Sequence, residues 1–343
     1  MKTGVVKDKR YLDHTMGPSH VESPQRLEAI YDHIEKGFSH LRTIEPRCAT
    51  EEEIGRIHKK EYIQTLKSTA GKERVILDPD TSTSAKSYQT ALLAAGGVLA
   101  AAEDIMNGTI NNGFALIRPP GHHAEAHRAM GFCLFNNIAI AAEHLQNIHG
   151  LERIFILDWD LHHGNGTQHS FYSRRDVLYS SLHQFPFYPG TGHWREIGEG
   201  KGEGYTVNVP LLGSKGDGDY LTILKDIIRP IILSYNPDFI LVSAGFDIYA
   251  GDPLGGMEVS IEGFGAMTQL LMEAAAEVCG NRLLLILEGG YHIQGQAASV
   301  LEVLRHLSGE AKKPDIRPES SLYLDRELGP VFKICSKYWN FRS

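Results

Sequence analysis

The chain has 343 residues, of which 42% are hydrophobic and 22% charged, a composition typical of a globular protein with a large core. Its 34 basic and 42 acidic residues give a net charge of −8, and the lack of a basic block argues against direct binding to nucleic acid. The N-terminus has no apolar signal-peptide core, the longest apolar stretch (residues 91–102) is too short to span a bilayer, and the four cysteines form no C-x-x-C pair. We therefore expect a cytoplasmic protein without a membrane anchor or a disulfide framework.

Helices and short apolar strands alternate along the sequence. The first helix is expected to follow Ser23, a candidate N-cap, with Pro24 at its first position and Gly37 at its end. Further helical segments are expected at 87–106, 138–148, 219–234 and 262–278. Aliphatic and aromatic runs predict strands at 114–117, 154–158, 177–182, 205–209, 239–243 and 283–287. This alternation predicts an α/β fold with a mostly parallel sheet covered on both faces, in a single domain spanning residues 1–343.

Five of the predicted strands run directly into polar turns rich in glycine or proline. These turns carry His, Asp or Tyr and read RPPGHHAEAH (118–127), WDLHHGNG (159–166), HQFPFYPGTG (183–192), AGFDIYAGDPLGG (244–256) and EGGYHIQG (288–295). Because ligands of open parallel sheets bind beyond the carboxyl ends of the strands, we expect the functional site at this edge of the sheet.

Two carboxylates and one imidazole in these turns form a candidate metal site. Asp160 and His162 are two residues apart, so their side chains point the same way on an extended segment. Asp247, at the end of another predicted strand, can supply the third ligand. Three protein ligands with a position open to water are typical of catalytic zinc, while the mixture of oxygen and nitrogen ligands leaves iron(II) open.

Two adjacent histidines, His122 and His123, follow a Pro-Pro-Gly turn that can aim both rings into one cavity. Hydrolysis at a metal requires a base for the attacking water and an acid for the leaving group, and two imidazoles can share these roles when each has an orienting partner. Asp158 and Asn165, which flank the metal-binding segment, are the candidate partners. Tyr291 lies on a glycine turn, from which its hydroxyl can stabilise an oxyanion.

Longer blocks around these residues resemble the signature of the histone deacetylase superfamily, and more narrowly its class II-like bacterial members, the histone deacetylase-like amidohydrolases. The blocks read RPPGHHAEAHRAMGFCLFNN, DWDLHHGNGTQ, SLHQFPFYPGTG, SAGFDIYAGDPLGGM and LEGGY, and the resemblance extends over residues 14–310. It implies a three-layer α/β/α fold of the arginase/deacetylase type around an eight-stranded, mostly parallel sheet. It also implies zinc-dependent hydrolysis of an acyl amide, usually the Nε-acetyl group of lysine.

The resemblance assigns roles to individual residues. Zinc ligands are implied at Asp160, His162 and Asp247. The paired histidines would serve as base and proton donor, with His123 preferred, and Tyr291 would polarise the carbonyl group. A structural potassium ion, held by backbone and side-chain oxygens, is implied at Asp158, Asp160, His162, Ser181 and Leu182.

The resemblance also implies a narrow channel for the lysine side chain. Phe132 would form one wall with Gly131 beside it, and Tyr188 would form the opposite wall, a position for which Phe187 could compete. Arg26 would lie behind the metal, and Leu254 would lie near the channel entrance. Polyamine-selective relatives tend to carry an acidic residue near this entrance, whereas a leucine offers a second ammonium no partner.

We therefore expect an acetylated lysine of a protein or peptide as the substrate, with an N-acetylpolyamine or another small acyl amine as the alternative. A catalytically silent scaffold that binds acyl-lysine is a further alternative, which predicts a damaged ligand set that the sequence does not show.

Two departures from related patterns bear on the subfamily and the metal count. Asn165 stands where class I members have aspartate, which fits the class II-like reading. Tyr249 stands where ureohydrolases of the same fold have a second aspartate, which disfavours a two-metal site. Near the C-terminus, Tyr338, Trp339 and Phe341 are expected to pack back on the domain, with a homo-oligomer contact as the alternative.

Overall fold

The computed structural model describes residues 1–38, 40–312, 321 and 323–341, and at its centre is an eight-stranded sheet in which all neighbouring strands are parallel. The strand order is β2-β1-β5-β10-β9-β6-β7-β8. Its strands are β1 (Thr3–Val6), β2 (Arg42–Ile44), β5 (Asn112–Ala115), β6 (Ile154–Asp158), β7 (Val177–Gln184), β8 (Thr206–Leu211), β9 (Phe239–Ala244) and β10 (Leu283–Leu287). A separate antiparallel pair consists of β3 (Val75–Ile76) and β4 (Ser82–Thr83).

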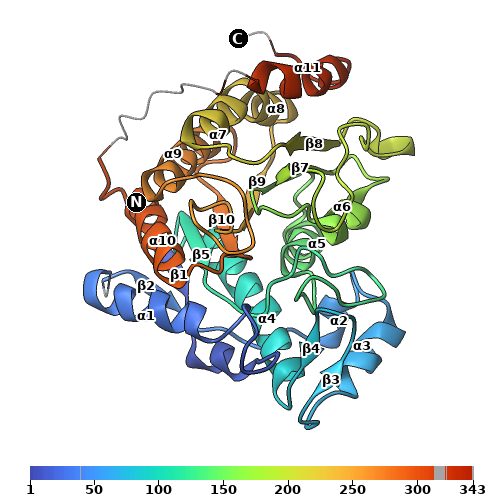
Figure 1. Cartoon of the computed structure of the whole chain (residues 1–343), viewed down its shortest axis with the longest axis vertical. Helices are drawn as coiled ribbons and strands as arrows, with labels where there is room; N and C mark the ends of the chain where they lie inside the picture. Colours follow the sequence, from blue (N-terminus) through green and yellow to red (C-terminus); the bar gives the residue numbers. More distant parts are fainter. Residues whose placement is uncertain (39, 313–320, 322, 342–343) are drawn as a thin grey trace.

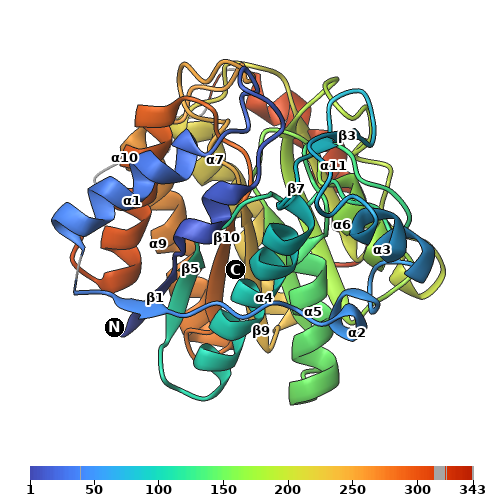
Figure 2. The same ribbon diagram turned by 90° about the horizontal axis from the view of Figure 1, so that it is seen from below.

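Helices cover both faces of this sheet and complete a three-layer α/β/α fold, as expected (Figures 1 and 2). On one face α1, α9 and α10 pack together, and on the other α4 packs against α5. The helices are α1 (Gln25–Gly37), α2 (Glu51–Ile54), α3 (Lys60–Lys67), α4 (Ser87–Met106), α5 (Asn137–His149), α6 (Asn165–Phe171), α7 (Asp217–Ile223), α8 (Arg229–Tyr235), α9 (Ile261–Val278), α10 (Ile293–Ser308) and α11 (Leu324–Cys335). Shorter helical segments are η1 (Lys9–Asp13), η2 (Gly200–Gly202) and η3 (Leu224–Ile228).

The apolar runs locate the central strands closely. Each of the five runs from 154–158 onward coincides with one of β6 to β10 to within two residues at either end, and the strand expected at 114–117 is β5, at 112–115. The sheet also contains β1 and β2, which the apolar pattern does not predict. The first is only four residues long, and two of the three residues of β2 are exposed, so neither gives a strong pattern.

Two helices differ from the prediction at positions where proline decides the local geometry. Ser23 does not cap α1, because Pro24 already has helical dihedral angles and the helix begins at Gln25 without a side-chain cap. The helix expected over 219–234 is divided into α7, the π-helical segment η3 and α8. The break precedes Pro230, which has no N–H to continue a regular helical ladder.

The core of the fold is apolar on both faces of the sheet. All residues of β9 and β10 are buried, which explains why these strands read as continuous apolar runs. Helix α4 packs closely against the segment before α2, since a Cβ atom at Gly96 would lie 1.9 Å from the carbonyl oxygen of Arg47. Among the described residues, none of the helices has the length and apolar character required to cross a membrane.

The C-terminal segment packs back on the domain. Helix α11 lies against the edge strand β8 (Figure 1), and Trp339 donates a hydrogen bond from Nε1 to the carbonyl oxygen of Gly204 over 2.9 Å. The indole ring also contacts the rings of Tyr205 and Tyr235, with centroids 5.3 and 5.9 Å apart. Phe341 packs on Phe332 of α11, and the hydroxyl of Tyr338 donates a hydrogen bond to Glu203 Oε1, so all three aromatic residues of the tail are in contact with their own chain.

Candidate active site and metal centre

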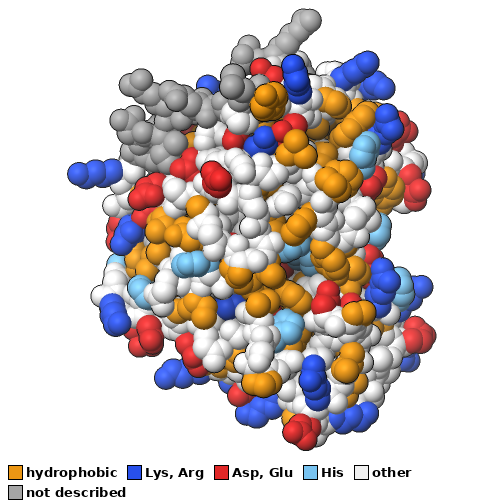
Figure 3. All heavy atoms as spheres, in the orientation of Figure 1, with side chains coloured by type: hydrophobic (Ala, Val, Ile, Leu, Met, Phe, Trp, Pro, Cys, Tyr) orange, Lys and Arg blue, Asp and Glu red, His pale blue; other side chains and the backbone are white. Residues whose placement is uncertain are grey.

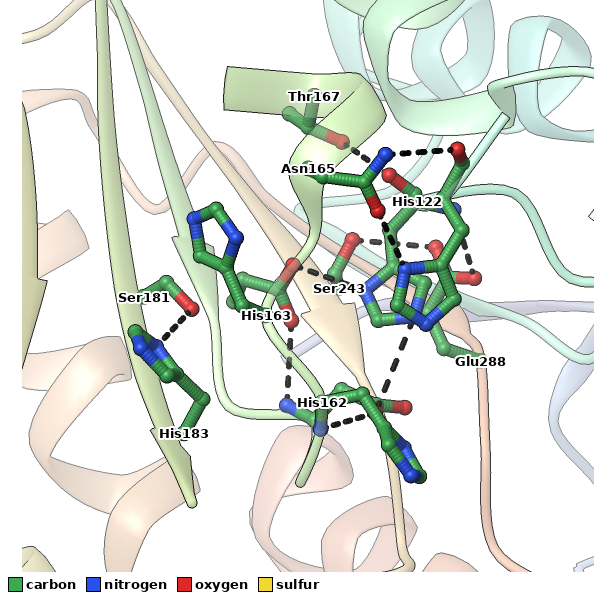
Figure 4. A network of polar contacts seen from close by, with 12 residues as sticks. His122, His162, His163, Asn165, Thr167, Ser181, His183, Ser243 and Glu288 are labelled. Atoms are coloured by element: carbon green, nitrogen blue, oxygen red, sulfur yellow. Dashed lines mark hydrogen bonds and ion pairs between the residues drawn. The ribbon is translucent and has the colours of Figure 1, made fainter. Parts of the chain in front are cut away.

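Polar side chains converge at the carboxyl ends of four adjacent strands, β5, β10, β9 and β6 (Figure 4). Asp158 is the last residue of β6, Asp247 follows β9, Glu288 follows β10 directly, and the paired histidines follow β5. The parallel register places these strand ends at one edge of the sheet. This edge is the position expected for a ligand site of an open parallel sheet.

Asp160, His162 and Asp247 form a compact group, in which one ligand atom from each lies within 4.8 Å of the others. His162 Nδ1 lies 3.2 Å from Asp160 Oδ1 and 3.0 Å from Asp247 Oδ2. Backbone N–H groups fix both carboxylates: Gly289 donates to Asp160 Oδ2, and Leu161 donates to Asp247 Oδ1, each over 2.9 Å. The two carboxylates therefore have little freedom to move apart.

The environment of these carboxylates fits a bound divalent cation. Asp160 and Asp247 are 1% and 0% exposed, and burial together with the charge of Asp160 raises the pKa of Asp247 to about 7. The backbone comes so close that a Cβ atom at Gly245 would lie 2.1 Å from Asp160 Oδ2, and one at Gly289 would lie 2.5 Å from Asp247 Oδ2. Two carboxylates and one imidazole suit zinc and also iron(II).

His122 and His123 lie beside this group with their ring centroids 4.0 Å apart. The structure gives each ring its own partner: His122 Nδ1 lies 3.0 Å from Asp158 Oδ2, and His123 Nδ1 lies 2.8 Å from Asn165 Oδ1. Both rings are 3% exposed. Burial lowers the pKa of His122, but the charges of Asp158 and Asp160 outweigh it and raise that pKa well above the usual value. Burial and the neighbouring His122 lower the pKa of His123. The two imidazoles thus differ in protonation tendency.

Glu288 holds the turn that carries the two histidines. Its Oε2 accepts hydrogen bonds from the backbone N–H groups of Gly121 (2.6 Å) and His122 (3.2 Å), and its Oε1 accepts one from Ser243 (Figure 4). The side chain is 1% exposed. Because Glu288 directly follows β10, it connects the end of that strand to the turn after β5.

Asn165 is itself held in one orientation. Its Nδ2 donates to Glu125 Oε1 over 2.6 Å and to the carbonyl oxygen of His123 over 3.3 Å. Glu125 Oε1 also lies 2.8 Å from Nδ1 of His169, whose side chain is half exposed. Burial raises the pKa of Glu125, but the hydrogen bonds of His169 and Asn165 outweigh it and lower that pKa. A chain of contacts therefore runs from His123 to the protein surface.

A cavity of about 80 Å³ opens onto this edge of the sheet. It is lined by Asp80, Pro120, His122, His123, Gly131, Phe132, Asp160, His162, Tyr188, Leu254, Gly289 and Tyr291. Of the residues expected in the channel, Phe187 and Arg26 are not among those that line it. Phe187 stacks on His162 with centroids 5.7 Å apart, and Arg26 lies beneath the ring of Tyr291 at 4.9 Å.

The wall formed by Gly131 and Phe132 has a left-handed backbone, with φ angles of 56° and 68°. The loop before β4 holds this wall, because Gly131 N–H donates to Asp80 Oδ1 (3.2 Å) and Phe132 N–H donates to Thr81 Oγ1 (3.0 Å). The ring of Phe132 meets that of Tyr291 edge to face, with centroids 5.9 Å apart. Two aromatic side chains thus border the cavity together.

Asp252 connects the turn of Leu254 to that of Tyr291. Its Oδ2 accepts the backbone N–H groups of Tyr291 (2.6 Å) and His292 (3.0 Å), while its Oδ1 accepts that of Leu254 (3.0 Å). Arg26 supports the same loop from behind, donating from Nε to the carbonyl oxygen of Gly290 over 2.6 Å. The position of the Tyr291 ring thus depends on a carboxylate and a guanidinium that are both outside the cavity lining.

Of the residues expected to hold potassium, Asp158, Ser181 and Leu182 lie on neighbouring strands, and Asp160 and His162 lie in the turn after β6. Asp158 of β6 is opposite Ser181 of β7 in the parallel register, and Ser181 Oγ lies 2.9 Å from His183 Nδ1 (Figure 4). Leu182 follows in the same strand. Tyr249, the residue that argues against a second metal, packs against the ring of His292 at 5.3 Å.

Several supporting residues were not predicted from the sequence: Asp80, Glu125, Asp252 and Glu288. Glu125, Asp252 and Glu288 lie within the polar turns after the strands, at 118–127, 244–256 and 288–295. Their position in these turns is the signal that could have identified them as supporting residues. Their partners could not be predicted, because most of them are backbone N–H groups or side chains distant in the sequence.

The surface around the site is mixed in character. On the face shown in Figure 3, Lys, Arg, Asp and Glu side chains are interspersed around the margin, while hydrophobic side chains gather toward the middle with histidines among them.

Comparison with known proteins identifies the family. The histone deacetylase domain family matches residues 20–307. The chain is 38% identical to a probable deacetylase of Archaeoglobus fulgidus, over 99% of both chains, and 38% identical to the polyamine deacetylase HDAC10 of Mus musculus, over 86% of this chain and 46% of the mouse protein. A crystal structure of an HDA15 HD domain superposes with a TM-score of 0.92 at 39% identity, covering 98% of this chain and 95% of that one. The chain spans about half the length of several eukaryotic relatives. It therefore belongs to the histone deacetylase family of amide hydrolases.

Proposed function

We propose that this protein is a zinc-dependent deacetylase that removes acetyl or related acyl groups from the Nε atom of lysine in proteins or peptides. The observation that carries this proposal is the convergence, beside one small cavity, of a two-carboxylate, one-imidazole donor set with two histidines that have different partners. Asp160, His162 and Asp247 would hold the zinc ion. When bound there, zinc acts as a Lewis acid toward the carbonyl oxygen and lowers the pKa of water.

His123 is suited to be the general base and then the proton donor to the leaving amine. Its Nδ1 faces the side-chain oxygen of Asn165, an acceptor that requires a proton on Nδ1 and so leaves Nε2 free to accept one. His122 faces the carboxylate of Asp158, which favours the protonated imidazole. In this assignment His122 supplies positive charge beside the reacting centre while His123 moves the proton.

Tyr291 is suited to donate a hydrogen bond to the oxygen that becomes negatively charged. Its ring lines the cavity, and Arg26 and Asp252 fix its backbone and its ring from behind. A donor that is already in place before the reaction stabilises the developing charge without further reorganisation.

The lining of the cavity favours an alkyl chain that ends in an amide. Phe132, Tyr188 and Leu254 present apolar surface to it, and this surface suits the methylene groups of a lysine side chain.

We further propose that residues 1–343 form one domain and that this domain contains a structural potassium ion between Asp158 and Ser181. Iron(II) is proposed as a metal that can replace zinc.

An N-acetylpolyamine is the second candidate substrate. It is favoured by Asp80, whose carboxylate lines the cavity and could pair with a second ammonium group, and by the similarity to a relative named a polyamine deacetylase. Leu254 argues against it, because an apolar side chain at the entrance gives that ammonium no compensation for desolvation.

The test is to compare kcat/KM of the zinc-loaded enzyme for an acetyl-lysine peptide and for N-acetylspermidine, before and after removal of the metal by a chelator. We expect a preference for the peptide, loss of turnover without metal, and recovery with zinc or iron(II). A preference for the acetylated polyamine would reject the lysine assignment. His123→Ala and Tyr291→Phe should lose turnover while still binding one catalytic zinc, and full turnover in both would reject the roles given to these residues.

A further inference from the structure

A second group of side chains with the donor atoms of a metal site lies between α4 and α5, apart from the candidate active site. It consists of Glu103 on α4 and of His144 and His149 on α5, and one ligand atom from each lies within 4.8 Å of the others. Helix α5 begins after Asn136, whose side chain reaches the carbonyl oxygens of His122 and Ala124 near the active site. His144 lies eight residues further along this helix, roughly 12 Å away at 1.5 Å per residue.

Both imidazoles point at the same carboxylate oxygen. His144 Nε2 lies 2.6 Å from Glu103 Oε1, and His149 Nε2 lies 3.1 Å from that same atom. The first contact has the geometry of a hydrogen bond, but the second does not, and His149 Nε2 is buried without a hydrogen-bond partner. Two imidazole nitrogens and a carboxylate oxygen that face one point form the donor set of a divalent transition-metal ion.

A second carboxylate stands behind His144. This histidine is 4% exposed, and its Nδ1 is also buried without a hydrogen-bond partner, with Glu53 Oε1 as a carboxylate oxygen 3.8 Å away. A histidine that binds a metal through one ring nitrogen commonly directs the other ring N–H to a carboxylate. Glu53 is held in place by Arg47, which contacts both of its oxygens (2.5 and 2.8 Å).

The negative charge of Glu103 also favours a bound cation. Within the part of the chain that the structure describes, no lysine or arginine lies within ion-pair distance of this carboxylate, and its ion-pair partners are the two histidines. Arg47 acts on it only as a more distant charge. The side chains of Glu103 and His149 are 32% and 16% exposed, so the group is open to solvent on one side. Solvent therefore reaches the group from this side.

We propose that Glu103, His144 and His149 form a second, non-catalytic site for a divalent transition-metal ion of the zinc type. The ion would connect the C-terminal half of α4 to the C-terminal end of α5 and so stabilise the layer of helices on that face of the sheet. Since it binds only the folded chain, it would raise the melting temperature in proportion to the logarithm of its free concentration. The site does not depend on the deacetylase assignment.

The test is a zinc titration of the tag-free, full-length protein after removal of metal, followed by calorimetry and by metal analysis of the dialysed protein. Wild type should bind about two equivalents, His149→Gln about one, His162→Gln about one, and the double variant none. His33→Gln, which changes a partly buried helical histidine far from both groups in the sequence, is the matched control and should bind about two. His149→Gln should keep wild-type deacetylase turnover when one equivalent is present.

A wild-type protein that binds one equivalent, which His162→Gln then loses, would overturn the proposal, and so would a His149→Gln variant that still binds two. In either case Glu103, His144 and His149 hold no metal. Circular dichroism of the metal-free variants checks that each is folded, and Glu103→Gln provides an independent variant that must also lose the second equivalent. Loss of turnover in His162→Gln with one equivalent retained separates this site from the catalytic one.

Discussion

Replacing Glu125 with alanine should slow the reaction, although this residue does not line the cavity. Glu125 Oε1 accepts the Nδ2–H of Asn165 over 2.6 Å, and Asn165 Oδ1 in turn faces His123 Nδ1 at 2.8 Å. If the amide of Asn165 turned over, its oxygen would face the carboxylate of Glu125 and its NH₂ group would face His123. That arrangement would stabilise the tautomer of His123 that cannot accept a proton at Nε2. Glu125 therefore keeps the amide, and through it the imidazole, in the productive orientation.

The magnitude follows from the contact that is lost. A hydrogen bond to a charged group contributes about 1.5–3 kcal/mol, and each 1.36 kcal/mol is a factor of ten in rate. If the whole contribution acts on the orientation of Asn165, kcat of Glu125→Ala falls roughly 10- to 100-fold. The KM value should change little, because Glu125 makes no contact with the cavity.

The assay is steady-state turnover of an acetyl-lysine peptide by zinc-loaded variants. Glu125→Gln is the matched control, since a glutamine oxygen can still accept from Asn165, and it should retain most of kcat. His169→Ala removes the exposed partner of Glu125 and should have a small effect. In an Asn165→Ala background, Glu125→Ala should have almost no further effect, because the two residues act in series. Full additivity of the two substitutions, or wild-type kcat in Glu125→Ala, would refute this reasoning.

Three further predictions concern specificity, pH and the C-terminal segment. Leu254→Glu should raise the ratio of kcat/KM for N-acetylspermidine to kcat/KM for an acetyl-lysine peptide by about tenfold, because one new ion pair in a partly desolvated entrance contributes about 1–2 kcal/mol. An unchanged ratio would contradict the role given to Leu254. Burial lowers the pKa of His58 from 6.5 to about 4, so between these pH values the unfolded chain binds more protons than the folded chain. The free energy of unfolding must therefore fall as the pH drops from 6.5 to 4, by up to about 3 kcal/mol from this residue. Chemical unfolding of His58→Gln at pH 4 to 7 should show a smaller loss, and equal pH slopes for the variant and wild type would show that the assignment is wrong. Trp339→Ala removes an indole that is 8% exposed and should lower the free energy of unfolding by about 3–5 kcal/mol without changing the oligomeric state; a change of oligomeric state measured by light scattering would instead point to a subunit contact.

The central strands could be predicted from the sequence because their burial on both faces leaves a continuous apolar run. The turns after them carry polar residues in short motifs, so the candidate metal ligands and the paired histidines could be named before their geometry was known. Edge strands leave no such pattern: β2 exposes two of its three residues, and only its pairing with β1 reveals it.

The supporting residues show where sequence reasoning stops. Glu288 bonds to the backbone of Gly121, 167 positions earlier, and Asp252 bonds to the backbone of Tyr291, 39 positions later. Backbone N–H groups are common to all residues except proline, so no side chain in the sequence marks these partners. The choice between Phe187 and Tyr188 likewise depends on the path of one turn, which places Tyr188 in the cavity lining and Phe187 against His162.

The left-handed backbone at Phe132 has a consequence for engineering this protein. A non-glycine residue with a φ of 68° is strained by about 1–2 kcal/mol, and Phe132→Gly would relieve this strain at the cost of a more flexible unfolded chain. That variant would also remove the ring that meets Tyr291 edge to face. The strain relieved at this position is therefore offset by lost packing beside the cavity, and a library screened for melting temperature alone would not show what the ring contributes to the cavity wall.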